Sequence, residues 1–156
     1  MVSTGANPVA GEAEQMGKPA IPDHDRVLRR LSDSGPNMIA VDVLTGDRRP
    51  SSGAFKPDED GLSVFREAVL DEAQMTAADV AVSPQNLVVA LSIAEVRSIA
   101  PLDVRDDPWP IDVPDPAHPR YAAHALITGW DGLGKGERLR RQKQLSRLPS
   151  LAFIHP

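Results

Sequence analysis

The sequence predicts an α+β fold: a single domain with a mixed sheet of about five short strands and three or four short helices. The chain has 156 residues, enough for one hydrophobic core, and no cysteine, so disulfides are excluded as its source of stability. Short apolar runs of strand length are interspersed with segments that have helical spacing or helix-capping residues. Strands and helices of this size are typical of one α+β domain.

Residues 1–22 are rich in Ala, Gly, Glu and Pro and have no sustained apolar period. We expect a disordered leader there, followed by a core domain over residues 23–134. The leader lacks the basic start and apolar stretch of a signal peptide, and no run approaches the roughly 18 apolar residues of a membrane helix. We therefore expect a cytoplasmic protein without a membrane partner.

The first part of the core domain contains one ambiguous segment and one strand. Residues 23–31 fit either a short helix or a strand, and their spacing does not decide between the two. The β-branched run over residues 38–44 predicts a strand, which ends in a tight turn at residues 45–47.

The middle of the chain predicts a strand that turns directly into a helix. Residues 62–65 alternate like a strand, whereas the apolar positions from 62 to 73 have helical spacing, so we expect the change near Arg66. A short helical turn follows, and Thr76 together with Asp79 has the spacing of a helix cap.

A second strand followed by a helix comes next. Residues 86–91 form a short continuous apolar run, which is typical of a buried strand. Ser92 and Glu95 have the spacing of a capping box, so we expect a helix from about residue 93 to residue 99, ended by Pro101.

The last third of the chain contains a proline-rich loop between strands. After an expected strand at residues 102–105, five prolines within residues 106–120 exclude a regular helix or central strand. We expect a long surface loop there, anchored by Trp109. Residues 121–128 predict another strand, and a glycine-rich turn leads to residues 135–156, where we expect a basic helix and a short terminal strand.

Charge is distributed unevenly along the chain. The formal net charge is −5, yet residues 135–147 contain six basic residues and one acid, which gives this segment +5 and leaves −10 for the rest. The basic residues are Lys135, Arg138, Arg140, Arg141, Lys143 and Arg147. The expected helix has apolar residues only at 139, 145 and 148, a stripe too thin to bury much area. We therefore expect a peripheral helix that docks on a protein partner or contacts nucleic acid.

No segment carries the complete pattern of a metal or cofactor site, so we expect neither. Residues 129–135 match Gly-x4-Gly-Lys, but Gly136 stands where a phosphate-binding loop has Ser or Thr. A calcium loop would place Lys56 at its first carboxylate position. The four histidines lack the spacing of a zinc site.

One set of polar residues fits a pocket for a small anion. We expect Arg66 at a strand end, His124 within a strand, and Ser51, Ser52 and Lys56 in a bend. Such an arginine can bind phosphate or carboxylate with two hydrogen bonds, and a histidine can transfer a proton. The residue types favour a structural alternative: serines in turns, Lys56 and Arg66 paired with the carboxylates of residues 58–60, and His124 satisfied within the core.

Three short motifs follow one another in the core domain: Ser52-Gly-Ala-Phe-Lys-Pro57, Gly61-Leu-Ser-Val64 and Ala123-His-Ala-Leu-Ile127. In this order and spacing they resemble a group of small uncharacterised bacterial proteins with the pattern Ser-x-Ala-Phe-Arg/Lys-Pro, Leu-Ser-Val and His-Ala-x-Ile. The resemblance covers roughly residues 23–130 and not the basic segment. It implies no catalytic role, because the group has no known activity, and it is compatible with Ser52, Lys56 and His124 lying near one another.

The sequence favours a small binding or regulatory module that contacts a protein partner through the basic C-terminal helix. This hypothesis depends on the missing catalytic signatures, the thin apolar stripe of that helix and the proline-rich loop. One alternative is a small transferase or hydrolase acting on a phosphate-bearing substrate such as a nucleotide or RNA end, with Arg66 as anion holder and His124 as acid or base in one cleft. A second alternative is nucleic-acid contact through the basic segment alone.

Overall fold

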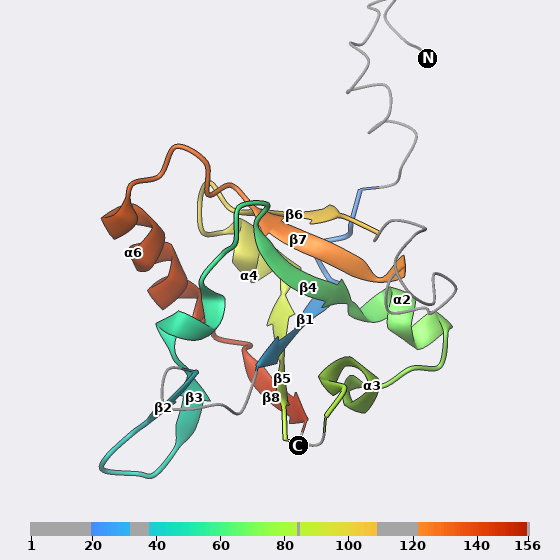
Figure 1. Ribbon diagram of the computed structural model, residues 1–156, viewed down its shortest axis with the longest axis horizontal. Helices are drawn as coiled ribbons and strands as arrows, with labels where there is room; N and C mark the ends of the chain where they lie inside the picture. Colours follow the sequence, from blue (N-terminus) through green and yellow to red (C-terminus); the bar gives the residue numbers. More distant parts are fainter. Residues whose placement is uncertain (1–19, 32–37, 84, 109–121, 156) are drawn as a thin grey trace, which may run out of the picture.

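The structure is a computed structural model, and it describes residues 20–31, 38–83, 85–108 and 122–155. Its centre is a six-stranded sheet in the order β6-β7-β4-β1-β5-β8, in which every described pair is antiparallel (Figure 1). The α+β class is therefore confirmed. The sheet strands are β1 (Arg26–Leu31), β4 (Leu62–Arg66), β5 (Leu87–Ser92), β6 (Asp103–Asp106), β7 (His124–Thr128) and β8 (Ala152–His155), and a separate hairpin contains β2 (Ile39–Val41) and β3 (Arg48–Pro50).

Short helices flank the sheet (Figure 1). They are η1 (Ser52–Phe55), α2 (Glu67–Glu72), α3 (Ala77–Ala81), α4 (Ile93–Arg97) and α6 (Lys135–Leu145). The predicted change from strand to helix is confirmed, because β4 ends at Arg66 and α2 begins at the next residue. The predicted cap of α3 is confirmed as well, since the Asp79 carboxylate accepts a hydrogen bond from the Thr76 N–H at 2.8 Å.

The ambiguous segment over residues 23–31 contains β1, a central strand of the sheet. β1 pairs with β5 over six residue pairs but with β4 over only two, Val27 with Arg66 and Leu28 with Phe65. Val27 is buried on one face of the sheet and Leu28 on the other. Burial on both faces explains why the apolar residues of β1 lack a clear alternating pattern.

A hydrophobic core lies on each face of the sheet. The larger core packs the sheet against η1, α4 and α6, and includes Val64, Phe55, Ile93 and Leu145. The smaller core packs it against α2 and α3, and includes Leu28, Phe65, Leu70 and Val80. Because side chains alternate along a strand, core membership shows which face each residue of the sheet occupies.

The helix after β5 differs from its predicted form. Ser92 caps α4 as expected, with its Oγ accepting a hydrogen bond from the Glu95 N–H at 3.3 Å. The Glu95 carboxylate, however, accepts from the N–H of Ser150 at 3.0 Å instead of reaching back to Ser92. The helix ends at Arg97, two residues earlier than expected. Glu95 thus ties α4 to the segment before β8, a long-range contact that the local pattern does not contain.

The core domain includes a residue of the segment that was predicted to be a leader. Ile21, within the predicted leader, is only 5% exposed and belongs to the larger core. Its carbonyl oxygen accepts a hydrogen bond from Arg97 Nη1 at 2.8 Å. Residues 1–19 and the proline-rich loop from Trp109 onward lie outside the described residues.

The C-terminal segment is built into the domain. Leu145 is fully buried and Leu148 is 9% exposed, and both belong to the larger core. β8 pairs with β5 and forms one edge of the sheet. The thin apolar stripe is therefore sufficient to fasten α6 to the body.

We predict that Leu145→Ala lowers the free energy of unfolding by about 2–5 kcal/mol, because it leaves a cavity in the larger core. Urea denaturation followed by circular dichroism measures the change. Leu139→Ala is the matched control: Leu139 lies on the same helix and is 41% exposed, so its loss should cost well under about 1 kcal/mol. Equal stabilities of the two variants would contradict the packing of α6 into the core.

Candidate functional site

The structure brings the predicted serine and lysine bend next to the basic helix. Ser52 begins η1 and Lys56 follows it, and η1 packs against α6 (Figure 1). The Ser51 N–H donates to the Met38 carbonyl at 2.9 Å, and the Ser52 carbonyl accepts from Gln142 Nε2 at 3.1 Å. The bend is thereby held between the β2–β3 hairpin and α6.

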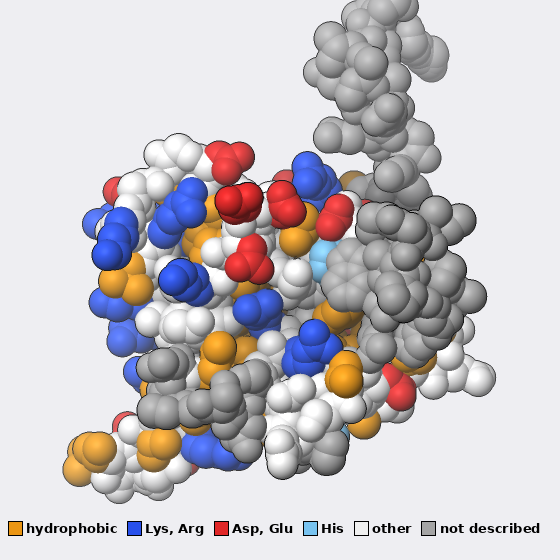
Figure 2. Space-filling model, viewed as in Figure 1, with side chains coloured by type: hydrophobic (Ala, Val, Ile, Leu, Met, Phe, Trp, Pro, Cys, Tyr) orange, Lys and Arg blue, Asp and Glu red, His pale blue; other side chains and the backbone are white. Residues whose placement is uncertain are grey.

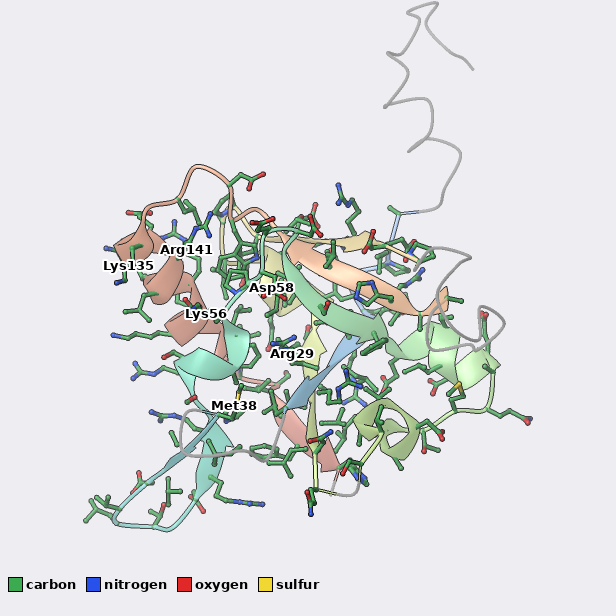
Figure 3. All side chains as sticks on the ribbon, viewed as in Figure 1. Arg29, Met38, Lys56, Asp58, Lys135 and Arg141 are labelled. Atoms are coloured by element: carbon green, nitrogen blue, oxygen red, sulfur yellow. The ribbon has the colours of Figure 1, made fainter. Side chains whose placement is uncertain are left out.

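Arg29 fixes the same bend to the sheet. Its Nε donates to the Ala54 carbonyl at 3.0 Å, and its Nη1 donates to the Ser63 carbonyl at 2.8 Å. Burial lowers the pKa of Arg29 to about 10, although the Asp58 carboxylate acts in the opposite direction. The guanidinium is still charged at neutral pH, so both carbonyls receive charge-assisted hydrogen bonds. Figure 3 shows Arg29 near η1, together with Lys56 and Asp58.

A groove of about 560 Å³ lies between the bend and the helix. It is lined by Lys56, Pro57, Leu133, Lys135, Arg138, Leu139 and Gln142. Figure 3 shows Lys56 and Lys135 on its two sides, and Figure 2 shows basic side chains gathered over α6. The groove, hereafter the basic groove, therefore combines three cations with an apolar lining.

Two of the six predicted basic residues help to fasten the helix. Arg138 Nε donates to the Leu133 carbonyl and Arg141 Nε to the Ala100 carbonyl, both at 3.2 Å. Arg141 Nη1 also lies 3.1 Å from the Glu137 carboxylate. These contacts leave Arg141 with a mainly structural role.

The other four basic residues are exposed. Arg140 lies 3.9 Å from the Glu137 carboxylate, a weak pair on the helix surface. The side chains of Lys135, Lys143 and Arg147 make no hydrogen bond or ion pair with another residue that the structure describes. Together with Arg138, which lines the groove, these cations are therefore the part of the predicted set that is available to a partner.

A second hollow, of about 330 Å³, lies between the end of α6, β8 and the β2–β3 hairpin. Arg48 and Arg49 line it from the hairpin, and Arg147 from the end of the helix segment. The guanidinium of Arg48 lies 5.7 Å from the ring centroid of Phe153, which is a cation–π distance. Basic residues therefore line this second hollow as well as the basic groove.

The β2–β3 hairpin projects from the body and carries apolar side chains at its end (Figures 1 and 2). Val43 is 94% and Leu44 is 92% exposed. The predicted strand is shorter than expected and ends at Val41, so these residues lie in the turn. The turn is ordered by Asp42, whose carboxylate accepts from the N–H groups of Thr45 and Leu44, and these hydrogen bonds lower the pKa of Asp42.

His124 lies outside the basic groove, in β7, and is only 2% exposed. Its ring meets the Phe65 ring edge-on, with 5.7 Å between centroids. Its Nε2 lies 3.0 Å from Ser63 Oγ, and its Nδ1 lies 2.7 Å from the Asp107 carbonyl oxygen and 3.3 Å from the Asp107 carboxylate. Both ring nitrogens therefore have polar partners.

Arg66 faces the opposite side of the sheet. His124 lies opposite Phe65 in the register, and successive residues of a strand point to opposite faces, so Arg66 faces away from His124. Arg66 Nη1 donates to the Asp106 carboxylate at 3.0 Å, and its Nη2 lies 3.8 Å from the Asp25 carboxylate. The structure therefore does not bring Arg66 and His124 into the common cleft that the enzyme alternative requires.

The residues at these sites that were not predicted include Arg29, Ser63 and Asp107. Ser63 belongs to the Leu-Ser-Val motif and His124 to the His-Ala motif, so the only signal for Ser63 was its place in that pattern. No local signal marks Arg29 or Asp107, because their contacts join residues far apart in the sequence.

Within the described residues, no group of three or more His, Asp or Glu side chains is placed to hold a metal ion. No helix in the same part of the chain is long and apolar enough to cross a membrane. Comparisons with protein-family models, curated proteins and solved structures find no match.

We predict that Arg29→Met lowers the free energy of unfolding by about 2–3 kcal/mol, because the Ala54 and Ser63 carbonyls lose their charged donor. Arg29→Lys keeps a cation but cannot donate to both carbonyls in the same way. The stability of this variant should therefore lie between those of the parent protein and Arg29→Met. Chemical denaturation measures all three proteins. A methionine variant as stable as the parent would contradict the role assigned to Arg29.

The pH dependence of this difference also follows from the lowered pKa of Arg29. The folded state loses the proton at about pH 10, before the unfolded state does, so the stability of the parent relative to Arg29→Met rises only above that pH. Between about pH 6 and pH 9 the difference should stay constant, because the arginine is charged in both states. A difference that changes near neutral pH would show that another group is responsible.

Proposed function

We propose that this protein is a binding module that contacts an acidic segment of a protein partner through the basic groove and the exposed face of α6. The supporting observation is the composition of the groove: Lys56, Lys135 and Arg138 border a lining that includes Leu133 and Leu139. Cations attract an acidic segment and steer its approach, whereas apolar side chains supply affinity that salt does not screen.

The groove favours a peptide over a nucleic acid. Proteins that bind single strands usually combine cations with aromatic side chains on which bases stack. None of the described residues that line the groove is aromatic, but two of them are leucines that fit aliphatic side chains. Nucleic-acid contact through the basic segment therefore has less support than contact with a peptide that carries both acidic and aliphatic residues.

The anchoring of α6 also supports a docking role. Gln142 and Leu145 hold the helix on η1 and on the larger core, so its exposed side chains have a defined position before any partner arrives. A surface that is ordered in advance loses less conformational entropy on binding than a flexible arm. The helix can therefore act as a rigid docking element.

We predict that a fluorescent peptide of alternating Glu and Leu binds more tightly than a Glu-only peptide or a single-stranded oligonucleotide of equal charge. Replacing both Lys56 and Lys135 by Glu should weaken binding of the first peptide about tenfold or more, since it turns attraction into repulsion at both sides of the groove. Fluorescence anisotropy at two salt concentrations measures each affinity.

The control for this experiment is Arg105→Glu, which reverses one exposed cation on β6, outside the groove lining. It should change the affinity of the Glu/Leu peptide much less than the double variant does. If all three probes bind with equal affinity, and if that affinity falls equally steeply with salt, the groove is a nonspecific basic surface and the proposed function is wrong.

A further inference from the structure

A serine, a histidine and an aspartate are joined on the face of the sheet opposite the larger core. Ser63 Oγ lies 3.0 Å from His124 Nε2, and His124 Nδ1 lies 2.7 Å from the carbonyl oxygen and 3.3 Å from the carboxylate of Asp107. We propose that Ser63 is a nucleophile activated by His124, and that the site accepts an acyl group from an anionic ester. This inference does not depend on the binding role of the basic groove.

The hydrogen bonds assign the proton on the imidazole. A carbonyl oxygen only accepts, so the short contact with Asp107 places the proton on His124 Nδ1. His124 Nε2 is then the acceptor, and the Ser63 hydroxyl donates to it. This is the protonation state in which a histidine can take the proton of a serine hydroxyl as general base.

The base is held in a fixed orientation while the serine remains accessible. The edge-on contact with Phe65 and the two contacts with Asp107 restrain the ring of His124, which is 2% exposed. Ser63 is the second residue of β4 and is half-buried. A restrained base beside a reachable hydroxyl is the arrangement required for nucleophilic catalysis.

Arg105 supplies a cation on the same face. In the register, Leu126 lies opposite both Ser63 and Arg105, so the three residues form one row across β4, β7 and β6. Two strand spacings separate Ser63 from Arg105, about 10 Å between their Cα atoms. Arg105 is exposed, and its guanidinium pairs with no other residue that the structure describes. It can therefore bind an anionic group of a substrate whose carbonyl lies at Ser63.

The reaction balances with water as the second substrate. Ser63 Oγ bonds to the ester carbonyl carbon while its proton passes to His124 Nε2, and the C–O bond to the alcohol then breaks as the alcohol takes that proton. Water next gives a proton to Nε2 and adds to the acyl carbon. The acid leaves, and Ser63 recovers its proton from His124.

A purely structural histidine is the competing explanation, because both of its nitrogens are satisfied. That explanation accounts for the hydrogen bonds but predicts that Ser63 reacts no faster than any exposed serine. It also gives Arg105 no part in the chemistry at Ser63. The two explanations therefore differ in a measurable rate.

The test is labelling with diisopropyl fluorophosphate, followed by peptide mapping by mass spectrometry. We expect one label, on Ser63, at a rate at least a hundredfold above those of exposed serines such as Ser98 and Ser150 in the same molecule. Ser63→Ala should abolish this label. Since the comparison among serines uses the unaltered protein, it does not depend on how any variant folds. Equal reactivity of Ser63 and the exposed serines would overturn the proposal.

The roles of the neighbouring residues are tested with variants whose melting curves match the parent. His124→Gln should lower the labelling rate about a hundredfold, since glutamine can hydrogen-bond the serine but cannot accept its proton. Asp107→Asn, which keeps the carbonyl, should lower it less. Arg105→Ala should slow hydrolysis of the 4-nitrophenyl monoester of succinic acid more than that of 4-nitrophenyl acetate. An unchanged ratio between these two esters would remove Arg105 from the site.

Discussion

β1 and β4 pair over only two residue pairs, and the candidate binding surface is built where this pairing stops. Beyond Leu28 and Phe65 the ladder no longer supplies hydrogen bonds, and the guanidinium of Arg29 takes its place by donating to the Ser63 and Ala54 carbonyls. Burial of this charge has a cost, which the lowered pKa of Arg29 records. The two hydrogen bonds in return fix η1 against the sheet, and η1 in turn positions α6.

The elements that the sequence predicted correctly are those whose signals are local. The Thr76 and Asp79 cap, the change from β4 to α2 and the continuous apolar run of β5 each lie within a few residues of chain. The features that were missed depend on contacts between distant segments. The Glu95 carboxylate hydrogen-bonds the N–H of Ser150 instead of completing the capping box. Ile21 belongs to the larger core, together with residues that are distant in the sequence. Contacts between distant segments cannot be predicted from the spacing of residues along the chain.

The composition of the basic helix was read correctly, but the contacts that hold α6 on the domain were not predicted. The apolar stripe of α6 is thin, but Leu145 is fully buried and Gln142 is only 8% exposed. The side-chain amide of Gln142 donates a hydrogen bond to the Ser52 carbonyl. A polar residue can thus belong to a packed face when its side chain hydrogen-bonds a backbone carbonyl there. Removing residues 135–156 would take β8 from the sheet and Leu145 from the core, so it would test stability as much as docking. Substitutions of exposed cations separate the two effects.

β4 connects the two candidate sites without merging them. The carbonyl of Ser63 accepts from Arg29, which supports the bend of the basic groove, whereas its hydroxyl meets His124. α6 packs against the larger core, and the pleat of the strand keeps the Ser63 side chain on the opposite face of the sheet. The basic groove borders α6, whereas the His124 side chain lies on the other face of the sheet together with Phe65. Binding at one site and chemistry at the other can accordingly be altered one at a time.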